Sequence, residues 1–147
     1  MTAPMPEIRG LAPYIEVFDM PASLHFYRDI LGFEKKMSSG EGDDVGWALL
    51  EQKNGAILML NTAYDEGERP DRPDPVRING HRDICFYFDC TDIDALYEYF
   101  VSMDIDLKPP IITGYGWKAI YVKDPDGFGS CFHYPIENKK GLSQSGG

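Results

Sequence analysis

The sequence predicts an α+β fold made of two βαβββ modules, and three observations support this. A strand-like stretch at residues 14–18 leads into apolar residues at helical spacing, which end before Gly32. The same order returns at residues 84–90 and in the helical pattern that follows Asp92. Between them, residues 62–82 hold prolines and many charges, a composition that cannot supply a core element. A repeated unit on each side of a linker indicates two copies of one module.

In the first half, the helix is expected to begin at residues 19–22. Its apolar positions are Leu24, Phe26, Tyr27, Ile30 and Leu31. A weaker strand is expected at residues 34–39. Residues 46–61 hold two alternating stretches joined by a tight glycine turn, which predicts a hairpin. The first half therefore contains one helix and four strands.

In the second half, Asp92 is expected to cap a helix, and a shift of 73 residues places Asp19 on it. The apolar positions of this helix are Ile93, Leu96, Tyr97, Phe100 and Met103. A weaker strand is expected at residues 107–112, and residues 116–134 form the second hairpin. Matching Trp47 to Trp117 needs a shift of only 70, so we expect a longer turn in this second hairpin, at residues 124–127.

We interpret residues 1–147 as one domain, with modules at residues 11–62 and 83–136, a linker at 63–82 and a flexible tail at 137–147. A curved sheet with a helix on one face leaves its other face open. Two such sheets set edge to edge would form one curved mixed sheet, a cup with the helices outside. The linker is expected to connect the modules; folding over the cup as a lid, or making dimer contacts, are the alternatives.

The formal net charge is −10, which repels phosphate backbones and anionic lipid, so nucleic acids and membrane surfaces are not expected partners. Three cysteines form neither a C-x-x-C motif nor a disulfide framework, which favours a reducing compartment. The first ten residues do not resemble a signal peptide, and no apolar run approaches 18 residues. We therefore expect a soluble, cytoplasmic protein.

Two strings carry a resemblance to a known family: VFDMPASLHFYRDILGF at residues 17–33 and KDPDGFGSCF at residues 123–132. They resemble the glyoxalase, bleomycin resistance and extradiol dioxygenase superfamily, also called vicinal oxygen chelate proteins. The resemblance runs from about residue 11 to residue 134. It implies paired βαβββ modules, a ligand in the cup, and often a homodimer with shared or swapped modules. Because this fold hosts several chemistries, it does not by itself give the function.

The resemblance also implies where metal-dependent members carry their His, Gln and Glu ligands. Those places fall on Ala12, Met59, Cys85 and Cys131 in this sequence. None of the four is an oxygen or imidazole ligand of the kind that a hard or borderline divalent ion requires. The sequence therefore predicts no metal and no cofactor, as in the bleomycin resistance branch. The alternative is a soft ion such as Cu(I), held by Met59, Cys85 and Cys131.

Strand alternation predicts which side chains face the cup, because successive residues point to opposite faces. The predicted ligand-binding residues are Tyr14, Glu16, Trp47, Met59, Asn61, Cys85, Tyr87, Asp89, Trp117, Tyr121, Cys131 and His133. Aromatic faces bind flat or cationic groups, and Glu16 and Asp89 would bind amines or guanidines. A metal-free protein that sequesters a bulky, basic, aromatic small molecule is the corresponding hypothesis.

Among the three histidines, only His133 has the strand position of a cup residue, which makes it a weak candidate general base. His25 is expected on the helix surface and His81 in solvent at the end of the linker. An enzyme remains the alternative: a lyase or isomerase of glyoxalase type, or a metal-independent one that uses His133 or Glu16 as base. A regulatory or assembly module with an empty cup is a third class.

Overall fold

The computed structural model describes residues 2–136 and contains two four-stranded mixed sheets of identical topology. The chain divides into two compact units between Arg69 and Pro70, and each unit holds one sheet. Both sheets combine a parallel pair with an antiparallel hairpin and a further antiparallel strand. The predicted α+β class and the two βαβββ modules are thus confirmed. The predicted tail lies outside the described residues.

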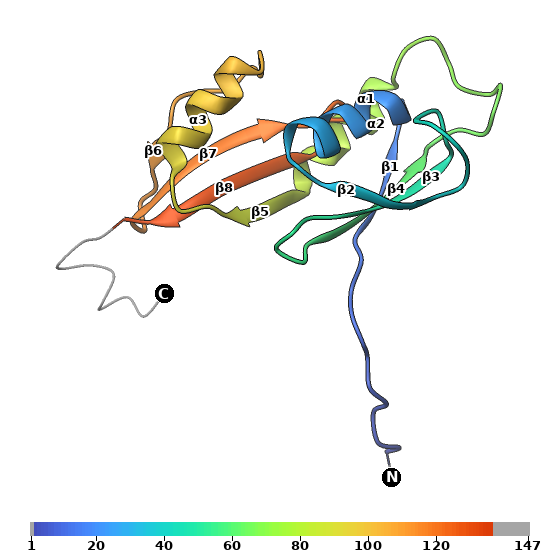
Figure 1. Cartoon of the computed structure of the whole chain (residues 1–147), viewed down its shortest axis with the longest axis horizontal. Coiled ribbons are helices and arrows are strands. Elements are labelled where there is room, and N and C mark those ends of the chain that lie inside the picture. The colour runs from blue at the N-terminus through green and yellow to red at the C-terminus, as the bar shows by residue number, and fades with distance from the viewer. Residues whose placement is uncertain (1, 137–147) are drawn as a thin grey trace. The chain divides into compact units, whose positions relative to one another are not determined.

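The first module follows the predicted order of strand, helix and three strands. Its elements are β1 (Tyr14–Val17), α1 (Met20–Leu24), the π-helical segment η1 (His25–Ile30), β2 (Glu34–Ser38), β3 (Trp47–Glu51) and β4 (Ile57–Thr62). The strand order in the sheet is β1-β4-β3-β2, with β1 parallel to β4 (Figure 1). One helical stretch was expected, and the structure divides it into an α-helical and a π-helical part.

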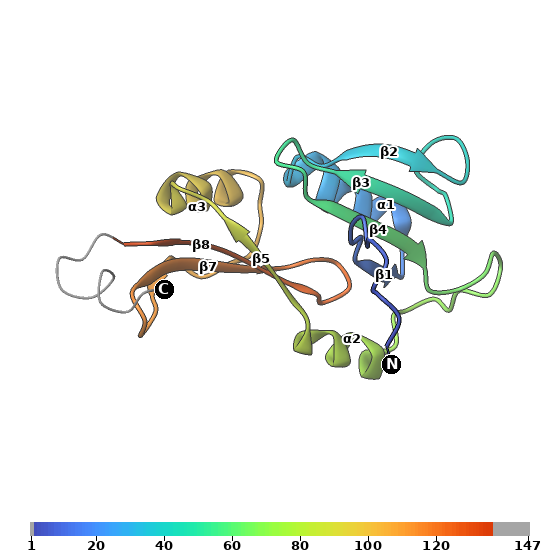
Figure 2. The same ribbon diagram turned by 90° about the horizontal axis from the view of Figure 1, so that it is seen from below.

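The core of the first module lies between its sheet and its helix. The strands bury every second residue, as in Ile15 and Val17 of β1 and Leu58 and Leu60 of β4. The helical side contributes Met20, Leu24, Phe26, Tyr27 and Ile30. Figure 2 shows α1 against one face of the strands. The alternate side chains of each strand point to the opposite face of the sheet, which we call the helix-free face.

The second module repeats this arrangement. Its elements are β5 (Cys85–Asp89), α3 (Ile93–Ser102), β6 (Ile111–Ile112), β7 (Trp117–Lys123) and β8 (Gly129–Pro135), in the sheet order β5-β8-β7-β6. The side chain of Asp92 accepts a hydrogen bond from the Ala95 amide at 3.0 Å, so the predicted N-cap is confirmed. Helix α3 contacts β7 and β8 on one side of the sheet (Figure 1). Phe100 is fully buried at this contact.

Asp104, two residues after the last residue of helix α3, is the one non-glycine residue with positive φ (58°) in the described part of the chain. The Ile105 amide donates a hydrogen bond to the Phe100 carbonyl at 3.0 Å, which satisfies one of the last carbonyl groups of the helix. Left-handed backbone is strained for residues with a Cβ and unstrained for glycine. This position therefore carries a small conformational cost.

We expect Asp104→Gly to raise the free energy of unfolding by about 0.5–1 kcal/mol, because glycine removes that cost. Urea denaturation followed by circular dichroism measures the change. Asp106→Gly is the matched control, since it removes a carboxylate two residues away where φ is not positive. A gain in the control as large as that in Asp104→Gly would show that lost charge, rather than relieved backbone, is responsible.

The two hairpins have turns of the same length, which corrects the predicted register. In the first hairpin Glu51 pairs with Ile57, and in the second Lys123 pairs with Gly129. Trp47 is opposite Asn61, whereas Trp117 is opposite Pro135 at the far end of its strand. The two tryptophans are therefore not equivalent, and the expected longer second turn is wrong. The shared Gly-Trp dipeptide is a local match, whereas register is set by the turn.

Part of the linker is helical and packs onto the turn between β7 and β8. Helix α2 (Pro75–Gly80) begins at Asp74, whose side chain caps Val76, and the short 3₁₀ segment η2 (His81–Asp83) follows. The ring of His81 stacks on Phe128 with centroids 3.9 Å apart, and His81 Nδ1 donates to the Asp126 carbonyl at 2.6 Å. His81, for which solvent contact is expected at the end of the linker, is half-buried by these two contacts.

No helix within residues 2–136 combines the length and the apolar character that crossing a bilayer requires.

Candidate functional site

The five predicted ligand-binding residues of the first module lie on its helix-free face. Tyr14 and Glu16 of β1 are exposed, alternating with buried neighbours, and they pair with Met59 and Asn61 of β4. Trp47 of β3 is opposite Asn61 and completes a row with Glu16. The predicted alternation is therefore confirmed, and it brings these five side chains together on one face of one sheet.

Tyr14 and Glu16 are coupled on this face. The Tyr14 hydroxyl donates to Glu16 Oε2 at 3.0 Å. Partial burial, and then this hydrogen bond to the carboxylate, raise the pKa of Tyr14. The tyrosine thus stays protonated and orients the carboxylate.

The seven predicted residues of the second module also share one helix-free face. They are Cys85, Tyr87 and Asp89 of β5, Trp117 and Tyr121 of β7, and Cys131 and His133 of β8. Tyr87, Cys131 and Tyr121 form one row across the strands, and Asp89 pairs with His133 in the next. Trp117 keeps the predicted face although its register differs, because a shift of two residues preserves alternation.

His133 lies within a cluster of aromatic rings. Its ring centroid is 4.3 Å from that of Trp117 and 5.1 Å from that of Tyr87. The contacts are tilted and edge-on, as aromatic packing favours. Within residues 2–136 no hydrogen bond joins the ring to a nucleophile, which is what a nucleophile–base pair would require. In the described part of the chain, His133 is therefore held by ring contacts with Trp117 and Tyr87.

The two thiols of this face are held in their neutral form. Burial raises the pKa of the Cys131 thiol, whose side chain is fully buried, and also that of Cys85. Partial burial, followed by the neighbouring Cys131, raises the pKa of Tyr121 to about 12.

The four positions that the resemblance assigns to metal ligands do not form a metal site in either module. Ala12 and Met59 belong to the first module, and Cys85 and Cys131 to the second. Among the described residues, no three His, Cys, Asp or Glu side chains come together in a way that could hold an ion. The donor chemistry therefore does not fit the divalent ions that metal-dependent members use.

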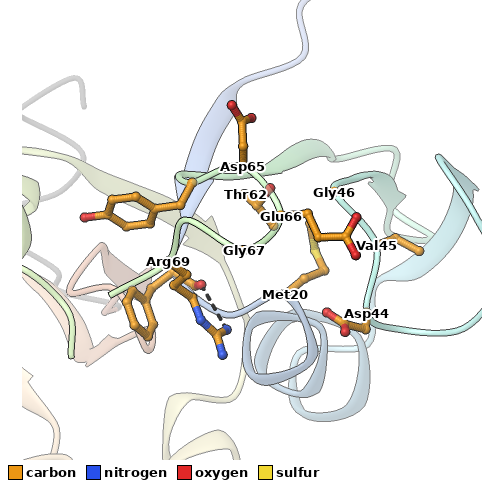
Figure 3. Close-up of a pocket in the computed structure, with 11 residues that line it drawn as sticks. Met20, Asp44, Val45, Gly46, Thr62, Asp65, Glu66, Gly67 and Arg69 are labelled. Carbon is orange, nitrogen blue, oxygen red and sulfur yellow. Dashed lines mark hydrogen bonds between the residues drawn. The ribbon is translucent and has the colours of Figure 1, made fainter. Parts of the chain in front are cut away.

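A cavity that the sequence did not predict opens in the first module where β1 and β4 end (Figure 3). Its volume is about 510 Å³, and its lining residues include Phe18, Met20, Asp44, Glu66 and Arg69. Its arginine is already engaged: the guanidinium lies 5.0 Å from the Phe18 ring centroid and donates to the Phe18 carbonyl at 3.4 Å. The charge of Arg69 in the cavity wall is therefore already engaged in an intramolecular cation–π contact.

A larger cavity, of about 910 Å³, lies in the second module and includes three predicted residues, Cys85, Tyr87 and Tyr121. The other lining residues are Arg82, Ile84, Asp104, Ile105, Asp106, Leu107, Lys108, Pro109, Ile111, Val122, Lys123, Gly127, Gly129 and Ser130. Sequence reasoning missed these partly because six of the fourteen, residues 104–109, belong to the connection between α3 and β6, whose path the sequence does not give. One available signal was the small pair Gly129-Ser130 in a strand that is otherwise bulky.

Solved structures with similar folds have several different functions. TnmS3, an antibiotic binding protein from Streptomyces sp. CB03234, shares 17% identity over 90% of this chain and 99% of its own, with a TM-score of 0.64. Lactoylglutathione lyase from Agrobacterium tumefaciens shares 18% over 87% and 94%, with a TM-score of 0.60. A virulence protein from Salmonella typhimurium shares 19% over 90% and 100%, with a TM-score of 0.62. Such identities establish the fold alone.

A search of curated proteins finds no match to this sequence. The family model described as Glyoxalase/Bleomycin resistance protein/Dioxygenase superfamily matches residues 12–132, which is most of the chain and includes all strands of both modules apart from the end of β8. With the repeated βαβββ topology, this match shows that the chain belongs to the glyoxalase, bleomycin resistance protein and dioxygenase superfamily.

Proposed function

We propose that this protein is a metal-free binding protein that sequesters a bulky aromatic small molecule on the helix-free faces of its sheets. One observation carries the proposal: the positions that the resemblance assigns to metal ligands are Ala12, Met59, Cys85 and Cys131, which lack the usual donors, while aromatic side chains lie beside them. Tyr14 pairs with Met59, and Tyr87 and Tyr121 both pair with Cys131. Aromatic surface without ion ligands is suited to binding and not to Lewis-acid chemistry.

The second module supports stacking of a flat ligand. The cluster of Trp117, His133 and Tyr87 offers ring faces on an exposed sheet, with Tyr87 56% exposed. Exposed aromatic groups of this kind bind planar molecules with little loss of side-chain entropy. In the first module Trp47 and Tyr14 offer a similar surface.

The ligand that we propose is cationic, because the first strand of each sheet carries a carboxylate at an equivalent place on the helix-free face. Glu16 and Asp89 are both exposed, and the Tyr14 hydroxyl orients Glu16. An amine or guanidine on an aromatic body would combine cation–π attraction with a charged hydrogen bond. Antibiotic or toxin sequestration by a cytoplasmic homodimer is the concrete version, and the fold shared with the antibiotic binding protein TnmS3 supports it.

The alternative is a lyase or isomerase of glyoxalase type. The fold shared with lactoylglutathione lyase supports it, as does the position of His133 beside Asp89 on the open face. Such an enzyme would need a metal site different from the family's usual one, or would use His133 or Glu16 as a base.

We expect chelator-treated protein to bind ethidium, a planar aromatic cation, with quenching of tryptophan fluorescence. Glu16→Gln and Asp89→Asn should each weaken ethidium binding about tenfold, since each removes one charge-assisted contact. Glu98→Gln on the exposed side of α3 is the matched control, because it changes the net charge equally and lies on a helix that covers the other face of the second sheet. Equal losses of ethidium affinity in all three variants would show that only the net charge of the protein, and not contact with Glu16 or Asp89, affects binding.

Two results would contradict this function. Unchanged affinity in both Glu16→Gln and Asp89→Asn would refute their assigned roles. Turnover of the thiohemiacetal of methylglyoxal and glutathione that disappears with chelator would favour the lyase instead.

A further inference from the structure

The first module holds one of its own cationic side chains just after the end of β1. The guanidinium of Arg69 lies 5.0 Å from the Phe18 ring centroid and 3.6 Å from Asp19 Oδ1. It also donates to the Phe18 carbonyl at 3.4 Å, the dashed line in Figure 3. An aromatic face, a carbonyl oxygen and a carboxylate together are suited to an organic cation. We call Phe18 and Asp19 the cation cradle.

Arg69 is held only weakly in the cation cradle. Its side chain is 51% exposed, and that of Asp19 is 44% exposed. Such ion pairs contribute little to stability, because solvent screens the charges. Both polar contacts of the guanidinium are also longer than about 3.2 Å, the upper end of the usual range for a hydrogen bond. A cation from solution can therefore replace Arg69 at a small cost in free energy.

The cavity that Phe18 and Arg69 line has room for the rest of a ligand, since its volume is about 510 Å³. Besides Arg69, its charged lining residues are three acids, Asp44, Asp65 and Glu66. In the part of the chain that the structure describes, the side chains of these acids have no hydrogen bond and no ion pair. Three carboxylates against one arginine give the cavity a negative potential, which attracts a cation and repels an anion.

We propose that the cation cradle binds an aryl guanidinium, which takes the place of Arg69. The arginine itself shows which group fits: a planar cation whose N–H groups donate to a carbonyl and a carboxylate while its face lies on Phe18. The aryl group occupies the cavity, whose wall includes Tyr64, packed edge-on against Phe18 with centroids 6.2 Å apart. Arg69 is then an internal competitor of the ligand. This site goes beyond the proposed function, because it uses neither of the two helix-free faces.

Removing the internal competitor tests this inference. Isothermal titration calorimetry measures the binding of phenylguanidinium to the full chain carrying Glu16→Gln and Asp89→Asn, in which the acidic faces do not contribute. Arg69→Ala should strengthen binding about fivefold, because the ligand no longer has to displace a tethered guanidinium. Adding Asp19→Asn should weaken it again by about fivefold or more, since the cradle loses its carboxylate. The Asp19 side chain makes no cap hydrogen bond to α1, so this change leaves the start of the helix intact.

Two controls separate displacement of Arg69 from changes in net charge and in space. Lys53→Ala removes the same charge from the same module, at an exposed position in the turn before β4, whereas the cavity lies where β4 ends. It should leave the affinity for phenylguanidinium within about twofold. Phenylurea has nearly the shape of phenylguanidinium without its charge, so Arg69→Ala should not strengthen the binding of phenylurea.

Four outcomes would overturn the inference. Unchanged or weaker binding of phenylguanidinium in Arg69→Ala would show that the arginine does not compete, and an equal gain in Lys53→Ala would reduce the effect to net charge. An equal gain for phenylurea would reduce it to space, and full binding after Asp19→Asn would place the cation elsewhere. The ethidium experiment is independent of these results, because it depends on Glu16 and Asp89. Failure of one therefore leaves the other standing.

Discussion

Replacing Asp126 with alanine is expected to lower the free energy of unfolding of the second module by about 3–5 kcal/mol. The Asp126 side chain is 1% exposed, and its Oδ1 lies 3.1 Å from Nη1 of Arg77, which is itself 19% exposed. Removing the carboxylate leaves a largely buried guanidinium without its counter-charge, which costs more than the pair itself contributes. Urea denaturation followed by circular dichroism measures the loss.

A second ion pair of the same module is the matched control. Lys118 and Asp94 are closer, at 2.6 Å, but Asp94 is 69% exposed. Because solvent screens such a pair, Asp94→Ala should cost less than about 1 kcal/mol. Equal losses in Asp126→Ala and Asp94→Ala would show that burial does not govern the strength of the Arg77 contact.

Gly127→Ala is expected to destabilise the second module by about 3 kcal/mol. Gly127 has a φ of 84°, where a side chain is strained. A Cβ there would also lie 3.0 Å from Ile78 Cγ2 and 3.2 Å from the Ile78 carbonyl oxygen, so helix α2 would have to shift. Both the backbone strain and the clash act in the same direction. Thermal unfolding by calorimetry measures the loss.

Gly55 is the equivalent residue in the first hairpin and separates the two causes. Its φ is 94°, but a Cβ there would meet no atom within 4 Å. Gly55→Ala should therefore cost only the backbone strain, about 1–2 kcal/mol. If the two glycine variants lose the same stability, the contact between α2 and the turn contributes nothing.

The parts of the structure that follow from strand alternation could be predicted from the sequence. Alternation assigned Tyr14 and Glu16 to one face and Ile15 and Val17 to the other, because a strand has no other way to bury half its side chains. The repeat of a capped helix after a strand identified both modules, since Asp92 is a strong local signal. The sequence alone was therefore enough to predict which candidate residues share a face of the sheet.

The register and the cavities could not be predicted in the same way. Trp117 was matched to Trp47 because both follow a glycine. The pairing of the two strands in each hairpin is set by the geometry of the turn, which the sequence Asp-Pro-Asp-Gly does not reveal. The lining of the second cavity includes residues 104–109, and the sequence does not give the path of the chain after Asp104. Helix α2 was missed among prolines and charges, although Asp74 followed by Pro75 is a start signal for a helix.

The contacts of the linker with the turn between β7 and β8 decide where the gene could be divided. A fragment that began at β5 would lack Arg77 and His81, and so would leave the Asp126 carboxylate without its cation and Phe128 without its stacking partner. A division of the chain upstream of Asp74, in the exposed stretch that starts after Arg69, would keep both contacts within the second fragment. Half-proteins, fusions and insertions in this chain should therefore keep the short helix attached to the domain that follows it.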